Sequence, residues 1–315
     1  MKIFSLRFSA AIVLAACLLT LSREARAHGL AGKRFFPATL ATDDPFVADE
    51  ASLPTFSTIV TPDDGGTRET EFSADIAKTI TPWLGVEVGG SLVNIDPPGG
   101  ASQTGLGNLE LGAKYQFLKN AEHEAIASVG FDAEIGGTGS TRVGADSFST
   151  WTPTLYFGKG LGDLPDAVWP LQPLAITGTF GVSIPSRATN QSVDDGEVEI
   201  ETNPHAMEFG FAVEYSLIYL QQNVRDLGIP APFDRLIPIV EFTFESPLDR
   251  GQSGLVTGTI NPGILWSGKS VQLGVEAIIP MNARTGNEVG VIAQVHLYLD
   301  DILPTIFRPI FGGRD

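Results

Sequence analysis

The middle of the chain alternates apolar and polar residues with a period of two. In LELGAKYQF, residues 109–117, every second residue is apolar, and the residues between them are charged, polar or glycine. The segments AIASVGFDAEI (125–135), MEFGFAVEYSL (207–217) and VQLGVEAII (271–279) repeat this pattern. Because successive side chains of a β-strand point to opposite faces, the pattern predicts strands with one apolar and one polar face.

The same pattern recurs in twelve segments. They are 55–61, 68–78, 84–95, 107–118, 124–136, 149–160, 172–184, 205–219, 236–246, 255–266, 270–281 and 288–300. Most are close to the roughly 9–11 residues that a tilted strand needs to cross a bilayer, and bacterial single-chain barrels have an even number of strands. The sequence therefore predicts an all-β fold, a transmembrane antiparallel β-barrel of about 12 strands.

The connections between the predicted strands support this interpretation. Those on one side, such as DPPGGASQTG and RATNQSVDDGEVEIETNP, are long and polar, whereas TITPW, KNAEH and GKS on the other are short. Longer exceptions lie near 161–171 and 220–235. Outer-membrane barrels combine short periplasmic turns with longer outer loops. A soluble β-sandwich also alternates, but its strands are typically about 5–6 residues long.

The first residues resemble a secretory signal peptide. Lys2 and Arg7 precede an apolar run over 8–21, and Ala25 and Ala27 form a small-x-small cleavage site. Leu14-Ala15-Ala16-Cys17 also fits a lipid-attachment box, although the apolar run continues past the cysteine. We expect cleavage after Ala27, which removes the chain's one cysteine and excludes disulfides and thiolate sites from the mature protein.

The mature chain is strongly acidic. Cleavage removes four basic residues and one acidic residue, a net +3, so the formal charge falls from −17 to −20. Nucleic acid and anionic membrane surfaces are therefore unsuitable partners.

The segment GILWSGKS (263–270) matches the phosphate-binding loop of nucleotide-hydrolysing enzymes. Such a loop requires a helix after it, whose N-terminal N–H groups bind phosphate. The residues that follow, VQLGVEAIIP, instead alternate with period two. We interpret Gly268 and Lys269 as the turn of a β-hairpin and predict no nucleotide site.

The polar face of the strands would line the barrel lumen, and it is rich in acids. The alternation of inward and outward positions along the strands places thirteen acidic residues on this face, with Lys114 as the single base and His296 near one end. The acids are Glu69, Glu71, Asp75, Glu87, Glu110, Asp132, Glu134, Glu208, Glu214, Glu241, Glu245, Glu276 and Asp300. A water-filled interior needs polar side chains, but uncharged or basic residues would serve equally well. That need therefore does not explain why the charges are negative. An acid-lined path favours cations and excludes anions.

The sequence offers little for catalysis. Of four histidines, only His296 falls on an inward strand position, and no motif brings a serine and a histidine together as in an acyl hydrolase. His123-Glu124 lacks the second histidine of a zinc protease helix, and an N-terminal His28 alone is weak support for copper binding. We predict no catalytic residues, no metal and no cofactor.

Two stretches, GLGNLELGAKYQF (105–117) and VHLYLDDILP (295–304), resemble a group of proteobacterial outer-membrane proteins described as transporters or as proteins of the phenol-degradation meta pathway. The resemblance implies an outer-membrane barrel that passes small, sometimes aromatic, solutes, and it transfers no functional residues. TIFRPIFGGRD follows the last predicted strand, whereas the terminal strand of outer-membrane barrels usually ends on an aromatic residue.

These observations predict a passive channel in the Gram-negative outer membrane, with lipid around it and small solutes or cations inside. The alternatives are a structural or surface-interaction barrel without an open pore and, less favoured, a membrane hydrolase. We expect the barrel over 55–304 and a periplasmic tail over 305–315. Residues 28–54 have no clear periodicity, so they could be a periplasmic lead or a plug. The sequence does not specify the oligomeric state.

Overall fold

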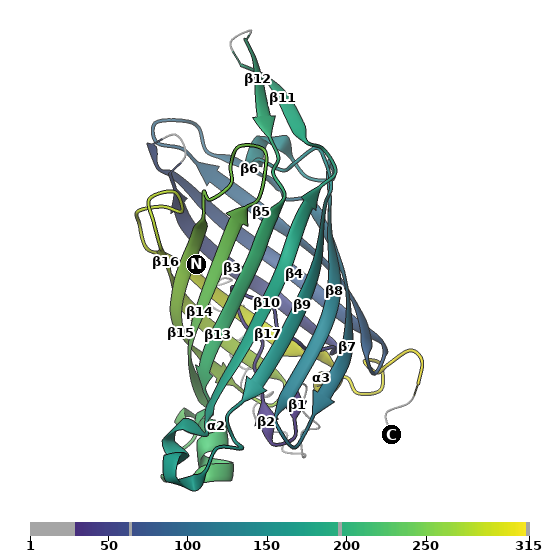
Figure 1. Cartoon of the computed structure of the whole chain (residues 1–315), viewed down its shortest axis with the longest axis vertical. Helices are drawn as coiled ribbons and strands as arrows, with labels where there is room; N and C mark the ends of the chain where they lie inside the picture. Colours follow the sequence, from purple (N-terminus) through teal and green to yellow (C-terminus); the bar gives the residue numbers. More distant parts are fainter. Residues whose placement is uncertain (1–28, 63–64, 195–196, 313–315) are drawn as a thin grey trace, which may run out of the picture.

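Twelve antiparallel strands close into a barrel. The computed structural model describes residues 29–62, 65–194 and 197–312. The barrel strands are β3 (Glu50–Thr61), β4 (Thr67–Thr81), β5 (Leu84–Asp96), β7 (Leu109–Asn120), β8 (Ala125–Ile135), β9 (Thr150–Gly160), β10 (Leu174–Pro185), β13 (Ala206–Tyr215), β14 (Leu236–Pro247), β15 (Thr257–Ser267), β16 (Val271–Pro280) and β17 (Gly290–Tyr298). Each pairs with its neighbours along the chain, and β17 pairs with β3 to complete the ring (Figure 1). The predicted fold class and strand number are confirmed.

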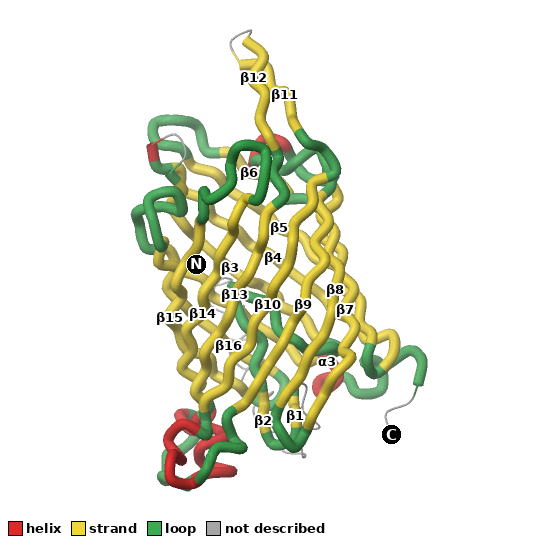
Figure 2. The backbone as a smooth tube through the Cα atoms, in the orientation of Figure 1, coloured by secondary structure: helices red, strands yellow, loops and turns green. Residues whose placement is uncertain are grey.

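The two ends of the barrel differ. At one end a separate two-stranded sheet, β11 (Thr189–Asp194) with β12 (Glu197–Thr202), projects from the barrel, and we call this the hairpin end. The short strand β6 (Gln103–Leu106) and the helix η2 (Thr141–Val143) lie in other connections of this end. The opposite end, the turn end, carries the tight connections and the short helices η3 (Asp166–Leu171), α2 (Leu217–Tyr219), η4 (Leu220–Val224), η5 (Phe233–Arg235) and α3 (Leu299–Ile302) (Figure 2).

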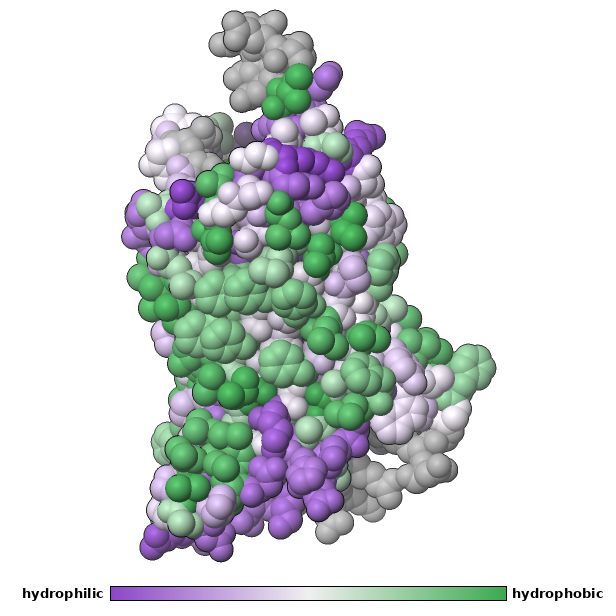
Figure 3. All heavy atoms as spheres, in the orientation of Figure 1, coloured by the Kyte–Doolittle hydropathy of each residue, from purple (hydrophilic) through white to green (hydrophobic). Residues whose placement is uncertain are grey.

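The outer face of the barrel is apolar. Large side chains from most of its strands are exposed, as expected from the period-two pattern: Phe72, Val88, Leu111, Phe131, Phe180 and Val275 are each 42–49 % accessible. On the face that Figure 3 shows, apolar residues form a belt across the middle of the barrel, with polar residues above and below. Such a belt is the lipid-facing surface of a transmembrane barrel. Among the described residues, no helix combines the length and the apolar character needed to cross a membrane.

The segment over 29–49, here called the N-terminal segment, lies inside the turn-end half of the barrel. It begins with the small hairpin β1 (Leu30–Ala31) and β2 (Arg34–Phe35) and continues without regular structure (Figure 2). Leu40 packs against inward-facing Ile237, Ile239 and Leu265, all of them buried. Phe36 and Phe46 pack against Ile126 on the other side. The molecule's core is therefore made by this segment and the lumen wall together.

Several boundaries differ from the prediction. β3 begins at Glu50, so residues 50–54 belong to the barrel. β13 ends at Tyr215, so the last residues of the predicted strand, 217–219, are helical instead. β17 ends at Tyr298, which places Asp300 in α3 rather than on an inward strand position. The predicted hairpin turn at Gly268 and Lys269 is confirmed, because β15 pairs with β16 and the N–H of Gly268 donates to the carbonyl of Val271. Residues 1–28, including the expected cleavage site, lie outside the described residues.

Candidate functional site: the lumen cavity

The lumen contains a cavity of about 780 Å³. Its floor is formed by residues 38–44 of the N-terminal segment, and its wall by inward-facing residues of the strands. Ten acidic side chains line it, and within 29–312 as described no lysine or arginine does. The acids are Asp43, Asp44, Glu50, Asp75, Glu87, Glu110, Asp132, Glu134, Glu208 and Glu245.

Many of these acids form two rows across strands β3 to β8. In the first row Glu134 is opposite Glu110, Glu110 is opposite Gly89, and Gly89 is opposite Asp75. A Cβ atom at Gly89 would overlap the Asp75 carboxylate and lie 3.6 Å from Oε2 of Glu110. The missing side chain at this glycine therefore leaves space that both carboxylates share.

The second row is built in the same way. Asp132 is opposite Gly112, and Gly112 is opposite Glu87. Glu87 is opposite Ala77, which in turn is opposite Glu50. Both rows lie on one side of the cavity, so negative charge is concentrated along that wall.

The facing wall carries hydroxyl groups. Threonines of β9, β10, β14 and β15 line the cavity there: Thr150, Thr152, Thr154, Thr179, Thr243, Thr257 and Thr259. Thr243 and Thr259 are hydrogen-bonded to each other through their hydroxyls at 2.8 Å. The cavity therefore combines a wall of two acidic rows with a threonine-rich wall, which also carries Glu208 of β13 and Glu245 of β14.

Lys114, the inward base, is engaged by the N-terminal segment. Its Nζ lies 2.8 Å from Oδ2 of Asp43, donates to the carbonyl of Asp44 at 2.8 Å and sits over the Tyr156 ring. Burial, and next the charge of Glu50, raise the pKa of the Asp44 carboxyl above its usual range. The positive charge of Lys114 is thus used to hold the segment.

Three predicted lumen acids lie beneath the N-terminal segment and not in the cavity. Glu214, Glu241 and Glu276 are at most 1 % exposed. Glu241 accepts hydrogen bonds from the backbone N–H groups of Leu40, Ala41 and Thr42 at 2.7, 3.1 and 2.6 Å. A carboxylate that accepts several such bonds is strongly stabilised where it is buried. Glu241 therefore fixes the middle of the segment to the barrel wall.

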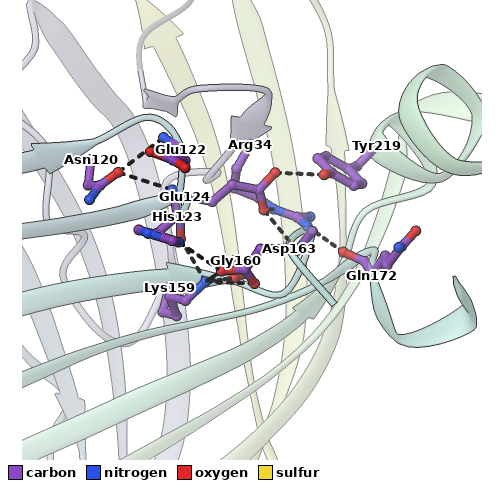
Figure 4. A network of polar contacts seen from close by, with 11 residues as sticks. Arg34, Asn120, Glu122, His123, Glu124, Lys159, Gly160, Asp163, Gln172 and Tyr219 are labelled. Atoms are coloured by element: carbon purple, nitrogen blue, oxygen red, sulfur yellow. Dashed lines mark hydrogen bonds and ion pairs between the residues drawn. The ribbon is translucent and has the colours of Figure 1, made fainter. Parts of the chain in front are cut away.

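A second anchor lies at the turn end, where Arg34 is fully buried (Figure 4). Its guanidinium donates to Oε2 of Glu124 at 3.1 Å and to the carbonyls of Gln172 and Pro173. It also stacks on the ring of Tyr219, whose hydroxyl donates to Oε1 of Glu124 at 2.6 Å. Burial, followed by the hydrogen bond to Glu124, raises the pKa of Tyr219 to about 12.

The predicted residues are thus divided among several places. Eight line the cavity: Asp75, Glu87, Glu110, Asp132, Glu134, Glu208, Glu245 and His296. Glu69 and Glu71 lie on the same face of β4 as Asp75, nearer the hairpin end and outside the cavity lining. His296 contacts Glu50 through Nε2 at 3.3 Å and Ser52 through Nδ1 at 3.1 Å.

Sequence reasoning missed Asp43, Asp44, Glu50 and the hydroxyl wall. The two aspartates have no periodic context, and Glu50 precedes the predicted start of its strand. Within the described residues no group of three or more histidine, cysteine or acidic side chains has the geometry to hold a metal ion.

Comparisons with known proteins identify the fold. No protein-family model matches the sequence, and no curated protein matches it. The COG4313 outer membrane channel from Pseudomonas putida F1 superimposes with a TM-score of 0.55 at 12 % identity, over 84 % of this chain and 99 % of that one. The KdgM porin gives a TM-score of 0.44 at 11 % identity over 78 % and 98 % of the chains, and the NanC porin 0.43 at 7 % over 79 % and 98 %.

The chain is therefore an outer-membrane β-barrel by fold, and the lipid-facing belt agrees with this location. Barrels of this class carry their longer loops outside the cell and their short turns in the periplasm. The loop lengths therefore predict that the hairpin end faces outward and the turn end faces the periplasm. The structure from Pseudomonas putida F1 is described as an outer membrane channel.

Proposed function

We propose that the protein is a passive outer-membrane channel for small solutes, with a lumen that favours cations. The observation that carries this proposal is the cavity itself, which is lined by ten acidic side chains and, as far as the structure describes it, by no lysine or arginine. Negative charge inside a low-dielectric wall raises the local concentration of cations and excludes anions.

The N-terminal segment restricts the size of what can pass. It is bonded to β14 through Glu241 and to β16 through Gln272, and on the far side of the barrel to β7 through Lys114 and β8 through Ser128. Passage must therefore occur beside the segment or after it moves. A twelve-stranded barrel is also narrower than a sixteen-stranded porin. Both features favour small solutes, and the resemblance to the phenol-degradation group is compatible with a small aromatic cargo.

The same segment supports a second candidate, a barrel without an open pore that acts through its surface. Its contacts on opposite walls fill the turn-end half of the lumen with buried side chains. The β11–β12 hairpin, which projects away from the barrel, would then be the surface that meets a partner (Figure 1).

Swelling of liposomes that contain the refolded mature chain separates the two candidates. A channel admits small organic cations faster than neutral solutes of equal size, and neutral solutes faster than anions. We expect cations, neutral solutes and anions to enter at similar rates in the triple variant Glu110→Gln, Glu134→Gln, Glu208→Gln. Solutes should still pass through this variant. Glu122→Gln, an acid exposed at a turn outside the lumen, is the matched control. Swelling no faster than in empty liposomes, by a folded protein, would favour the surface barrel.

A further inference from the structure

The residues after α3 expose more apolar side chain than their length would suggest. In the segment over 303–312, here called the tail, Leu303, Ile306, Ile310 and Phe311 are 44, 63, 56 and 66 % accessible. Leaving such side chains in water forgoes roughly 25 cal/mol for each Å² of apolar surface that could be buried. The tail therefore gains stability wherever an apolar environment covers it.

The tail is held in a defined place by its backbone. The N–H of Phe311 donates to the carbonyl of Ile80 at 2.8 Å, and the N–H of Ile310 to that of Thr79 at 3.3 Å. Lys78 also donates to the carbonyl of Arg308 at 2.7 Å. Since β3 begins at Glu50, opposite Ala77, its pairing does not cover the last residues of β4. The tail supplies hydrogen bonds along this uncovered stretch, as proteins commonly do to protect strand edges.

This position lies at the boundary of the lipid-facing belt. Ile80 is close to the β4–β5 turn, whose Trp83 is 48 % exposed, and exposed tryptophans mark the membrane–water interface of such barrels. Ile76, on the outer face of β4, and Val86, on that of β5, are 46 and 40 % exposed. Figure 1 shows the tail extending sideways from the turn end and not along the barrel axis. The tail is thus hydrogen-bonded to the end of β4, at the turn-end edge of the belt.

We propose that the tail is an interfacial anchor that lies in the phospholipid headgroup region of the periplasmic leaflet. Its apolar side chains enter the outer edge of the acyl chains, while exposed Arg308 stays at headgroup level. The tail thereby fixes the height of the barrel in the membrane and covers the uncovered stretch of β4. This role is independent of conduction.

Depth-dependent fluorescence quenching tests the proposal. The mature chain has no cysteine after removal of its leader, so single cysteines can carry a polarity-sensitive fluorophore. Phe311→Cys and Ile306→Cys place it on the tail. Val289→Cys, in a hairpin-end loop and 67 % exposed, is the aqueous control of matched exposure, and Phe180→Cys is the control in the middle of the belt. The proteins are refolded into phosphatidylcholine vesicles with bromine on the acyl chains, either near the headgroup or deep in the bilayer.

The expected result is several-fold stronger quenching of both tail probes by shallow than by deep bromines, the reverse order for Phe180→Cys, and little quenching for Val289→Cys. Tail probes that behave like Val289→Cys would overturn the proposal. It would also be overturned if the tail probes became shielded only as the protein-to-lipid ratio rose, because a second copy of the chain would then be the occupant. Heat-dependent gel migration confirms that each variant has folded before it is used.

Discussion

The Glu241 carboxylate connects two parts of the chain that are 200 residues apart in sequence. Fully buried itself, it accepts hydrogen bonds from three backbone N–H groups and from the hydroxyl of Thr42. A buried backbone N–H that loses its partner costs about 1–3 kcal/mol. At the residue scale, the position of the N-terminal segment therefore depends strongly on one side chain.

Replacing Glu241 by methionine should destabilise the protein. The substitution removes every acceptor for the three N–H groups, so we expect a loss of about 3 kcal/mol in the free energy of unfolding. Urea titration of the refolded barrel measures it. Glu245→Met, on the same face of β14 but lining the cavity, is the matched control and should change little. Equal effects of the two substitutions would show that Glu241 does not hold the segment.

Arg34→Met should also be costly. The substitution leaves the buried carboxylate of Glu124 without its cation and two buried carbonyls without a donor. We therefore expect a loss of about 3–5 kcal/mol in the free energy of unfolding. The exposed neighbour Lys33→Met is the control. Limited proteolysis provides a second readout, because the N-terminal segment of the Arg34 variant should be cleaved much faster than that of the wild type. Unchanged cleavage would contradict the anchoring role.

A third prediction concerns pH at the turn end. Hydrogen bonds from Lys159 and then His123 hold the pKa of Asp163 below its usual value, and Figure 4 shows these groups together. A depressed carboxyl pKa contributes stability that is complete above the unfolded-state pKa and is lost as pH falls through the folded-state pKa.

Lys159→Met should therefore raise the pKa of Asp163 toward its ordinary value, as followed by NMR titration of the carboxyl carbon. Lys33→Met should leave it unchanged. An Asp163 pKa that stays low in the Lys159 variant would rule out the ammonium as its main cause.

At the scale of elements, the β11–β12 hairpin is separable from the barrel. Within the described residues its two strands pair only with each other, and its base is held by the N–H of Asn203 donating to the carbonyl of Ala188 and by Gln252 donating to Thr202. Replacing residues 189–202 by Gly-Gly should change the unfolding free energy by less than about 0.5 kcal/mol, as for other surface changes. Replacing 217–235 at the turn end should be far more destabilising, since Tyr219 belongs to the buried Arg34 network. If both replacements had similar effects, the hairpin would be part of the folded core.

The strands were predictable wherever the alternation was unbroken. LELGAKYQF keeps its period through β7 up to Gln116, where a register shift brings Phe117 and Leu118 both to the exposed side. The start of β3 was missed because its register shifts between Ser52 and Thr55, where Pro54 lacks a backbone N–H. Residues 216–219 continue the alternation of β13, yet the Ser216 hydroxyl accepts from the N–H of Tyr219 and begins a helix. The alternation of residues therefore does not predict strand ends where a β-bulge or a helix N-cap interrupts the strand.

The candidate site was predictable in part for the same reason. The alternation along each strand predicts that side chains such as Glu110 and Asp132 point into the lumen. It cannot separate them from Glu241 and Glu276, which occupy equivalent positions but lie beneath the N-terminal segment. That segment has no periodicity, and its place is set by contacts to distant residues such as Gln272 and Ser128. The open choice between a lead and a plug could not be made without the tertiary structure.

At the scale of the whole molecule, the lumen has two unlike halves. The turn-end half is filled by the N-terminal segment and apolar wall residues, and the hairpin-end half is a cavity whose acids lie mostly in two rows on one wall and whose other wall is rich in threonine. Such a molecule would select by charge in the cavity and by size beside the segment. Where water fills the cavity, two like charges about 4 Å apart repel by only about 1 kcal/mol, and the repulsion grows where the lumen narrows.

The measurement that tests this account most directly is the reversal potential of the refolded mature protein in a planar bilayer under a KCl gradient. An acid-lined channel should give discrete current steps and a reversal potential with the sign of potassium selectivity. The potential should move toward zero when Glu110, Glu134 and Glu208 are replaced by glutamine. A reversal potential of the chloride sign, or one that is unchanged by these substitutions, would contradict the claim that the acids of the cavity select the permeating solute.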